Sequence, residues 1–255
     1  MKRRFVPAVV LAAAATVAAS AGEARSPWTF RQTLGAQSRV RIDDIDGTIT
    51  ARAAHGPDAV VRAVVTGRDA ARVRVLERRS GTTLRYCVVF DDRARCDGGG
   101  GGGNAGPIEA RVDFEATVPA GVAFSASDVN GRIVADVRSD VELSTVNEGI
   151  TVVTDGTVRA HAVNGAIDAT LGAGGGDTPL QFSTVNGSVH LTLPRRANAT
   201  VDASTLSGGI AADRGVALVT HDGEYVGRSG TATYGSGGRR VSVRTVSGSI
   251  RLSAN

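Results

Sequence analysis

A five-residue pattern recurs seven times in this chain and constrains its fold more than any other feature. Each copy has an apolar residue, a short polar turn that contains Gly, and a second apolar residue four positions after the first. The copies span residues 45–49, 129–133, 146–150, 163–167, 185–189, 206–210 and 246–250. From Ile133 onward, the second apolar residues are separated by 17, 17, 22, 21 and 40 positions. A period near 20 residues with short apolar segments is typical of a β-solenoid, in which each repeat forms one coil.

The polar positions of these turns carry residues that suit a tight corner. Gly tolerates a positive φ, and Asn can hydrogen-bond its own backbone. The predicted turn residues are Asp46, Gly47, Asn130, Gly131, Asn147, Gly149, Asn164, Gly165, Asn186, Gly187, Ser207, Gly208, Ser247 and Gly248. Asn-Gly between two strands also favours a hairpin, so a β-sandwich or meander is the alternative fold. We favour the solenoid because a hydroxyl pair before the turn, as in Ser144-Thr145 and Ser183-Thr184, recurs together with a short aliphatic strand after it.

The first 21 residues have the features of a signal peptide. They begin with the basic Lys2-Arg3-Arg4, continue with an apolar run over residues 5–19, and end in the small-residue sequence Ala19-Ser20-Ala21. The apolar run is shorter than the roughly 20 residues that a membrane-spanning helix needs. We therefore predict export to the periplasm or the cell surface, or secretion, with no transmembrane span after cleavage. An uncleaved N-terminal anchor is the alternative.

The rest of the chain divides into two β regions. Residues 22–121 are predicted to form an N-terminal antiparallel β section, because apolar and polar residues alternate over 59–65, 72–76 and 83–90. Its Gly-rich loop, residues 97–106, has no Lys and no following helix, so it lacks the features of a phosphate-binding loop. Residues 122–255 are predicted to form the solenoid repeat region, with an insertion over 213–240 that suits a long loop or hairpin. No segment after residue 21 has helical periodicity, and the predicted fold class is all-β.

Charge and cysteine content bound the possible partners. The chain has 29 Lys and Arg against 25 Asp and Glu, and three of the basic residues lie in the predicted signal peptide. The mature chain would have 26 against 25, a net charge of +1, which gives no indication of a nucleic-acid partner. Cys87 and Cys96 are the two cysteines. Since export leads to an oxidising compartment, we predict that they form a disulfide. A thiolate or metal pair is the weaker alternative, because no His is nearby.

The ordered series of turns resembles the DUF4097 family of β-strand-repeat proteins, which are often described as candidate adhesins. The resemblance rests on the exported N-terminus, on residues 45–49, on Val118-Pro119-Ala120-Gly121 ahead of the repeats, and on the serial Val-Asn-Gly or Ser-Gly units. It covers roughly residues 38–255. The resemblance implies a β-solenoid at the bacterial envelope, and it supplies no catalytic residues.

No group of residues in the sequence indicates catalysis, a cofactor or a metal. A glycoside hydrolase needs two carboxylates across a cleft. The acidic residues of the repeats, however, do not recur at one repeat position; they are Asp128, Asp136, Asp140, Glu142, Glu148 and Asp168. The four histidines share no ligand spacing; they are His55, His161, His190 and His221. Asp43, Asp44 and Asp46 form the densest acidic cluster and could hold a cation weakly, although turn chemistry explains Asp46 equally well. We predict no catalytic, cofactor-binding or metal-binding residues.

Three classes of function follow, in decreasing order of support. The first is a non-enzymatic exported envelope or surface protein, which presents a repetitive face of Ser, Thr, Asn and Arg to a glycan, the cell wall or a protein. The second is a structural or assembly protein that acts through end-to-end or heterologous β contacts. Arg244 and Arg251 in the closing strands argue against the second class, because charges hinder pairing at a sheet edge. The third and least favoured is a β-helix enzyme that processes polysaccharide.

Overall fold

The computed structural model describes residues 27–90, 96, 108–174, 176–223 and 226–255. The predicted signal peptide, residues 1–21, and the Gly-rich loop, residues 97–106, lie outside the described residues. Strands dominate the described part of the chain, which also contains one short 3₁₀ turn at Ala70–Arg72. No helix among the described residues has the length and apolar character needed to cross a membrane.

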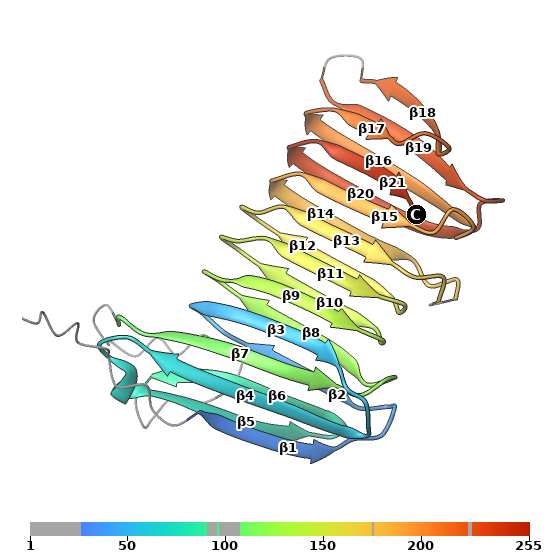
Figure 1. Ribbon diagram of the computed structural model, residues 1–255. Coiled ribbons are helices and arrows are strands. Elements are labelled where there is room, and N and C mark those ends of the chain that lie inside the picture. The colour runs from blue at the N-terminus through green and yellow to red at the C-terminus, as the bar shows by residue number, and fades with distance from the viewer. Residues whose placement is uncertain (1–26, 91–95, 97–107, 175, 224–225) are drawn as a thin grey trace, which may run out of the picture.

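The strands form two large sheets that enclose one elongated hydrophobic core (Figure 1). Sheet A has ten strands, in the spatial order β1 (Trp28–Thr33), β4 (Asp58–Thr66), β7 (Arg111–Val118), β3 (Gly47–Ala53), β9 (Arg132–Val137), β11 (Ile150–Thr154), β13 (Ile167–Leu171), β15 (Val189–Leu193), β21 (Ile250–Ala254) and β17 (Ile210–Ala212). Sheet B has eleven strands, in the spatial order β18 (Ala217–Asp222), β19 (Arg228–Tyr234), β16 (Ala199–Ser207), β20 (Arg239–Ser247), β14 (Leu180–Asn186), β12 (Val158–Ala162), β10 (Val141–Thr145), β8 (Ala123–Asp128), β2 (Arg39–Asp43), β6 (Thr83–Phe90) and β5 (Val73–Ser80).

Each repeat is one coil, made of a strand in sheet B, a corner turn and a strand in sheet A. The coils are the strand pairs β2/β3, β8/β9, β10/β11, β12/β13, β14/β15, β20/β21 and β16/β17. Neighbouring coils pair in parallel and in register, so that Ile150 lies between Ile133 and Ile167. The predicted all-β solenoid is confirmed.

The core is built from columns of like residues that the register aligns. Each strand alternates buried and solvent-facing residues, as strands with one face on the core do. In sheet A one inner column consists of Ile49, Ile133, Ile150, Ile167, Val189, Ile250 and Ile210. In sheet B a column alternates small and large residues over Ala126, Leu143, Ala160 and Phe182. Complete burial of one such aliphatic side chain is worth about 1.5–3 kcal/mol.

The N-terminal section continues both sheets of the solenoid. Antiparallel pairs occur there as predicted, between β1 and β4, β4 and β7, and β5 and β6. In addition, β2 and β3 form a coil that pairs in parallel with β8 and β9. The chain between β3 and β8 is therefore an excursion between the first and second coils of the stack.

The last coil in the sequence is not the last coil in the stack. Strand β20 lies between β14 and β16, and β21 lies between β15 and β17 (Figure 1). The prediction that Arg244 and Arg251 protect an exposed closing strand is wrong, because both residues lie on internal strands. The reason is the insertion over 213–240. It forms the β18–β19 hairpin, in which β19 runs antiparallel to β16 and returns the chain to the start of that coil.

Candidate binding face

The seven predicted turns lie one above another along a single edge of the solenoid, where the chain passes from sheet B to sheet A. Backbone bonds join successive corners: Asn130 N donates to Ile45 O over 2.9 Å, and Asn147 N donates to Val129 O over 2.9 Å. The same contact joins Asn164 N to Val146 O over 2.6 Å. The stack thereby brings the predicted turn residues together, with Asp46 and Gly47 at one end and Ser207 and Gly208 at the other.

Asparagine side chains form a hydrogen-bonded ladder on the outside of this edge. Asn147 Nδ2 donates to Asn130 Oδ1 over 2.7 Å, and Asn164 Nδ2 donates to Asn147 Oδ1 over 3.1 Å. Asn186 Nδ2 donates to Asn164 Oδ1 over 2.9 Å. Each amide is thus hydrogen-bonded to the amide of the next corner, and the ladder fixes the register of four successive corners.

A threonine ladder lies on the inner side of the same edge. Thr145 Oγ1 donates to Gly131 O over 3.0 Å, and Thr184 Oγ1 donates to Gly165 O over 2.9 Å. Thr245 and Thr205 bond to the carbonyl groups of the neighbouring corners in the same way, over 2.8 and 2.9 Å. These hydroxyl groups are buried, so each bond satisfies a donor and an acceptor that water does not reach.

The outer face of sheet B carries three columns of aligned side chains beside this edge. The apolar ridge, at the corner end of the strands, consists of Val129, Val146, Val163, Val185, Val246 and Leu206. The hydroxyl column consists of Ser127, Ser144, His161, Ser183, Arg244 and Ser204. The mixed column consists of Ser125, Glu142, Arg159, Gln181, Ser242 and Asp202. The first two columns give a long surface on which apolar residues and, at four of six coils, serine hydroxyl groups repeat about 4.8 Å apart.

The apolar ridge is unusual for its exposure. Val129, Val146 and Val246 are 39%, 36% and 43% exposed, and Leu206 is 55% exposed. Val163 and Val185, in the middle of the ridge, are half-buried. Single exposed aliphatic residues need no explanation, whereas a row of apolar residues with a polar border is typical of an interaction surface. The ridge and the hydroxyl column beside it are therefore the candidate binding face.

A shallow groove of about 280 Å³ adjoins the face where the sheet B strands begin. Its lining residues are Arg39, Asp140, Val141, Glu142, Thr157, Arg159, Thr178 and Pro179. Arg39 Nη1 lies 3.0 Å from Glu142 Oε2, and both side chains remain largely exposed. The groove thus offers hydrogen-bond donors and acceptors of both charges to a polar ligand.

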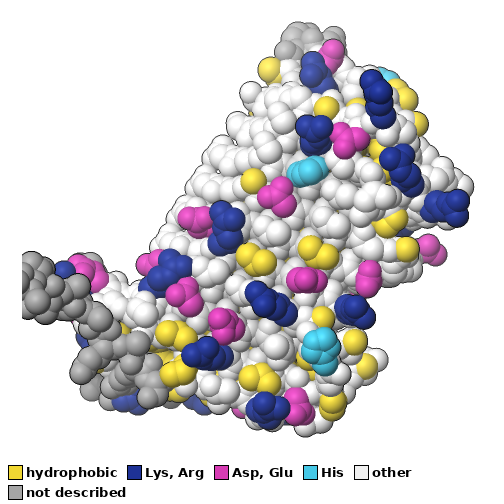
Figure 2. Space-filling view, viewed as in Figure 1, with side chains coloured by type: hydrophobic (Ala, Val, Ile, Leu, Met, Phe, Trp, Pro, Cys, Tyr) yellow, Lys and Arg dark blue, Asp and Glu magenta, His cyan; other side chains and the backbone are white. Residues whose placement is uncertain are grey.

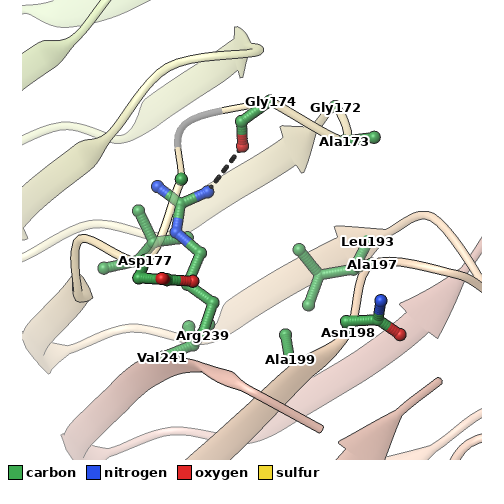
Figure 3. Close-up of a pocket in the computed structure, with 12 residues that line it drawn as sticks. Gly172, Ala173, Gly174, Asp177, Leu193, Ala197, Asn198, Ala199, Arg239 and Val241 are labelled. Atoms are coloured by element: carbon green, nitrogen blue, oxygen red, sulfur yellow. Dashed lines mark hydrogen bonds between the residues drawn. The ribbon is translucent and has the colours of Figure 1, made fainter. Parts of the chain in front are cut away.

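A smaller pocket of about 220 Å³ lies at the edge of the solenoid opposite the stacked turns, beside the loop that joins β13 to β14 (Figure 3). Arg239 occupies one side, and its Nη1 and Nε donate to Gly174 O and Thr178 O, both over 2.9 Å. Burial lowers the pKa of this guanidinium group. Leu193 and Ala197 line the opposite side. Two backbone carbonyl groups engage Arg239 and fasten the loop, while its buried Nη2 has no hydrogen-bond partner.

The structure also brings Asp168, His190 and Ser253 together on the outer face of sheet A. His190 Nε2 lies 2.9 Å from Ser253 Oγ, and His190 Nδ1 lies 3.9 Å from Asp168 Oδ1. The Ser253 hydroxyl is mostly buried and donates to Asp213, which lowers the pKa of the Asp213 carboxyl group. A nucleophilic serine must pass its proton to a base that a carboxylate orients. Here Ser253 is hydrogen-bonded to Asp213 and Asp168 is beyond hydrogen-bond range of His190, so we assign these residues no catalytic role.

The acidic cluster that the sequence singled out does not converge on one point. Asp43 faces outward and pairs with Arg41 and Arg85, whereas Asp44 is buried in the core. Among the described residues, no three His, Cys, Asp or Glu side chains are arranged to hold a metal ion. Charged side chains are instead interspersed, as Figure 2 shows for the face in view.

Two buried carboxyl groups were missed in the sequence. Burial, followed by repulsion from Asp128, raises the pKa of Asp44 to about 8. Burial also raises the pKa of Asp128 to about 7, and Asp46 adds to the increase. The signal was present in the repeats, since Asp44 and Asp128 occupy the position directly before the turn that Thr145 and Thr184 occupy in later copies.

Cys87 and Cys96 are joined by a disulfide in the N-terminal section. With Val89 they form a small buried cluster, separate from the main core, against which Leu76 packs. Arg85 Nη1 donates to Cys96 O over 2.6 Å and ties the residue to β6. The cluster anchors the chain after β6 to sheet B.

Comparison with known proteins gives one family and several solved structures. The model of the Toastrack DUF4097 family matches residues 129–253. A candidate cell adhesion protein from Clostridium sporogenes ATCC 15579 is similar at 8% identity and a TM-score of 0.46, over 90% of this chain and 100% of that one. A candidate adhesin from Bacteroides fragilis NCTC 9343 is similar at 8% identity and a TM-score of 0.30, over 91% and 98%. A search of curated proteins found no match. At these identities and TM-scores the solved structures say nothing of a shared ligand.

Proposed function

Residues 129–253 belong to the Toastrack DUF4097 family, and we propose that this chain is a non-enzymatic binding protein of the cell envelope or surface. Its solenoid presents the outer face of sheet B to an envelope saccharide. The observation that carries the proposal is the pairing of two continuous columns, the apolar ridge and the hydroxyl column, over six parallel strands.

The chemistry of the two columns suits a polysaccharide. A sugar ring has hydroxyl groups at its rim and apolar C–H groups on its faces. The hydroxyl column supplies small groups that donate and accept, such as Ser144 and Ser183, and the ridge supplies aliphatic contact beside them. Each contact is weak, but linked contacts to one polymer chain reinforce one another through effective concentration.

The outer face of sheet A is less regular. Its column nearest the corner changes character at each coil, through Val134, Thr151, Asp168, His190 and Arg251. Its second column has hydroxyl groups in the last three coils, at Thr170, Thr192 and Ser253, but begins with Asp136 and Val153. A repeating ligand would meet less uniform chemistry on that face. Sheet B is therefore the better candidate, and sheet A supplies matched control positions.

Assembly is a second candidate, because strand β18 is an exposed sheet edge. Its residues are almost all exposed, and Val219 is 59% exposed. An edge strand with unpaired backbone groups can add a strand from another chain. The protein would then oligomerise through β18, which size-exclusion chromatography with light scattering would detect. The variant Val219→Lys should then be a monomer.

The test of the binding proposal is co-sedimentation of the protein with isolated cell envelopes and with purified cell-wall polysaccharide. The face variant carries Ser144→Arg and Ser183→Arg, which place two large side chains in the hydroxyl column. The control variant carries Thr151→Arg and Thr170→Arg on sheet A, at positions of similar partial burial.

We expect saturable pelleting that soluble polysaccharide competes away. The face variant should lose about tenfold or more in affinity, which corresponds to about 1.4 kcal/mol, whereas the control should bind like the unmodified protein. Equal loss in both variants, or no pelleting of the unmodified protein, would contradict the proposal.

A further inference from the structure

The buried edge column holds two carboxyl groups where the later coils have hydroxyl groups. Thr145 of β10 pairs with Asp128 of β8. Strand β8 in turn pairs with β2, where Ser127 lies opposite Asp43, so the residues that follow them, Asp128 and Asp44, lie side by side. Both aspartates are almost fully buried, with 5% and 2% of their surface exposed. They occupy the junction between the N-terminal section and the repeat region.

Each aspartate lies between N–H groups of its own turn and a carbonyl group of the strand beneath. Ile45 N donates to Asp44 Oδ1 over 2.8 Å, and burial raises the pKa of Asp128 by more than the N–H groups of Val129 and Asn130 lower it. In the coil above, Thr145 donates to Gly131 O. A side chain added at Gly47 would collide with both Val112 O and Oδ2 of Asp44, so this carbonyl group and this carboxyl group adjoin the same space. A side chain added at Gly131 would collide with both Gly47 O and the Asp128 carboxyl group, so these two groups share the same space. Oδ2 of Asp44 and both carboxyl oxygens of Asp128 have no hydrogen-bond partner. A carboxylate against a carbonyl oxygen is repulsive, whereas a carboxylic acid can donate to it.

The surrounding charges also disfavour ionisation. From the turn after β2, the facing acids are Asp44 and Asp46, and from β7 the facing groups are Asp113 and Arg111. Arg111 is already engaged, because it pairs with Asp113 and its Nη2 donates to Thr48 Oγ1 over 2.6 Å. The coil above contributes the uncharged Thr145. Four acids thus lie near one cation.

We propose that Asp44 and Asp128 are neutral carboxylic acids that donate to the backbone carbonyl groups beneath them and act as a proton-dependent latch between the N-terminal section and the repeat region. Loss of both protons places two adjacent negative charges at the junction. That repulsion loosens the contact of β3 with β9 and of β2 with β8. These strand contacts are therefore strongest when both groups are protonated and weaken as the pH rises.

The sign of the pH dependence follows from the raised pKa values of about 8 and about 7. In the unfolded chain both groups ionise near pH 4. Between that pH and the folded-state pKa values, only the folded protein keeps the protons. Its stability therefore falls as the pH rises from about 4 to about 8, and levels off above that.

The experiment is thermal unfolding of the full chain between pH 5 and pH 9, alongside NMR titration of the two carboxyl carbons. The variants are Asp44→Asn with Asp128→Asn, whose amides still donate, and Asp128→Thr, which copies Thr145. The control is Asp136→Asn, an exposed acid on sheet A. We expect the melting temperature of the unmodified protein and the control to fall by about 5 °C or more across this range, and that of the double variant to stay level.

Three results would overturn the proposal. One is a carboxyl titration of Asp44 and Asp128 near pH 4. Another is an equal pH slope in the double variant. The third is a rise in the melting temperature at pH 8 on adding Ca²⁺ or Mg²⁺ that the double variant lacks, because a bound cation would then replace the protons. If the double variant fails to fold, Asp128→Thr alone must still reduce the slope.

Discussion

Asn147 donates its side-chain amide to Oδ1 of Asn130, 2.7 Å away and 17 residues earlier in the chain. This contact spans exactly one coil, so it joins the same position of two successive repeats. It is the first rung of a ladder that Asn164 and Asn186 extend. Since all four amides lie at exposed corners, the ladder specifies the alignment of coils rather than adding to the buried core.

The ladder predicts an order of stability among its members. Asn164→Ala removes two side-chain bonds, one to Asn147 and one from Asn186, and should lower the free energy of unfolding by about 1–2 kcal/mol. Asn130→Ala removes one side-chain bond and should cost about half as much. Urea unfolding measures both. Equal effects of the two substitutions, or a larger effect of Asn130→Ala, would contradict the ladder.

The corner glycines predict a much larger effect. A Cβ on Gly165 would collide with Glu148 O, a backbone atom of the preceding corner that cannot move independently of its coil. Gly165→Ala should therefore destabilise the protein by about 3 kcal/mol or more. Gly56 has open space around it, and Gly56→Ala should change stability by less than about 1 kcal/mol. Similar melting temperatures for the two variants would show that the corners are not closely stacked.

The disulfide predicts a redox-dependent stability confined to the N-terminal section. Cys87 and Cys96 are nine residues apart, and a loop of that size is worth about 2–3 kcal/mol when closed. Replacing both cysteines with Ala should lower the free energy of unfolding by that amount and abolish the effect of reductant. Hydrogen exchange should increase in β5 and β6 and stay unchanged in β12 and β13. An equal stability of the oxidised and reduced protein would contradict this.

The repeated turn was sufficient to predict the solenoid because its period is local. Each copy shows where one coil turns, and parallel register then aligns the same repeat position of successive coils, as with Ser144, His161 and Ser183. The place of the last coil could not be predicted in this way. Its position depends on the β18–β19 hairpin. Nothing in the local sequence indicates that β20 lies between β14 and β16 rather than on the far side of β16.

The candidate face was partly predictable for the same reason. The Ser, Thr and Asn positions were identified, but whether each lies inside or outside depends on the strand alternation that only the register fixes. Thr145 and Thr184 prove to be buried while Ser144 and Ser183 face outward. The ionisation of Asp44 and Asp128 depends on burial against two carbonyl groups, and three-dimensional stacking alone creates that environment.

The most direct test of the central claim is methyl NMR of the protein during titration with purified cell-wall polysaccharide. Val146 on the apolar ridge and Val153 on the outer face of sheet A have similar exposure, 36% and 41%. We expect shifts or broadening of the methyl signals of Val129, Val146 and Val246, with those of Val153 unchanged. Perturbation of Val153 alone, or of neither face at saturating polysaccharide, would contradict the claim that sheet B carries the binding surface.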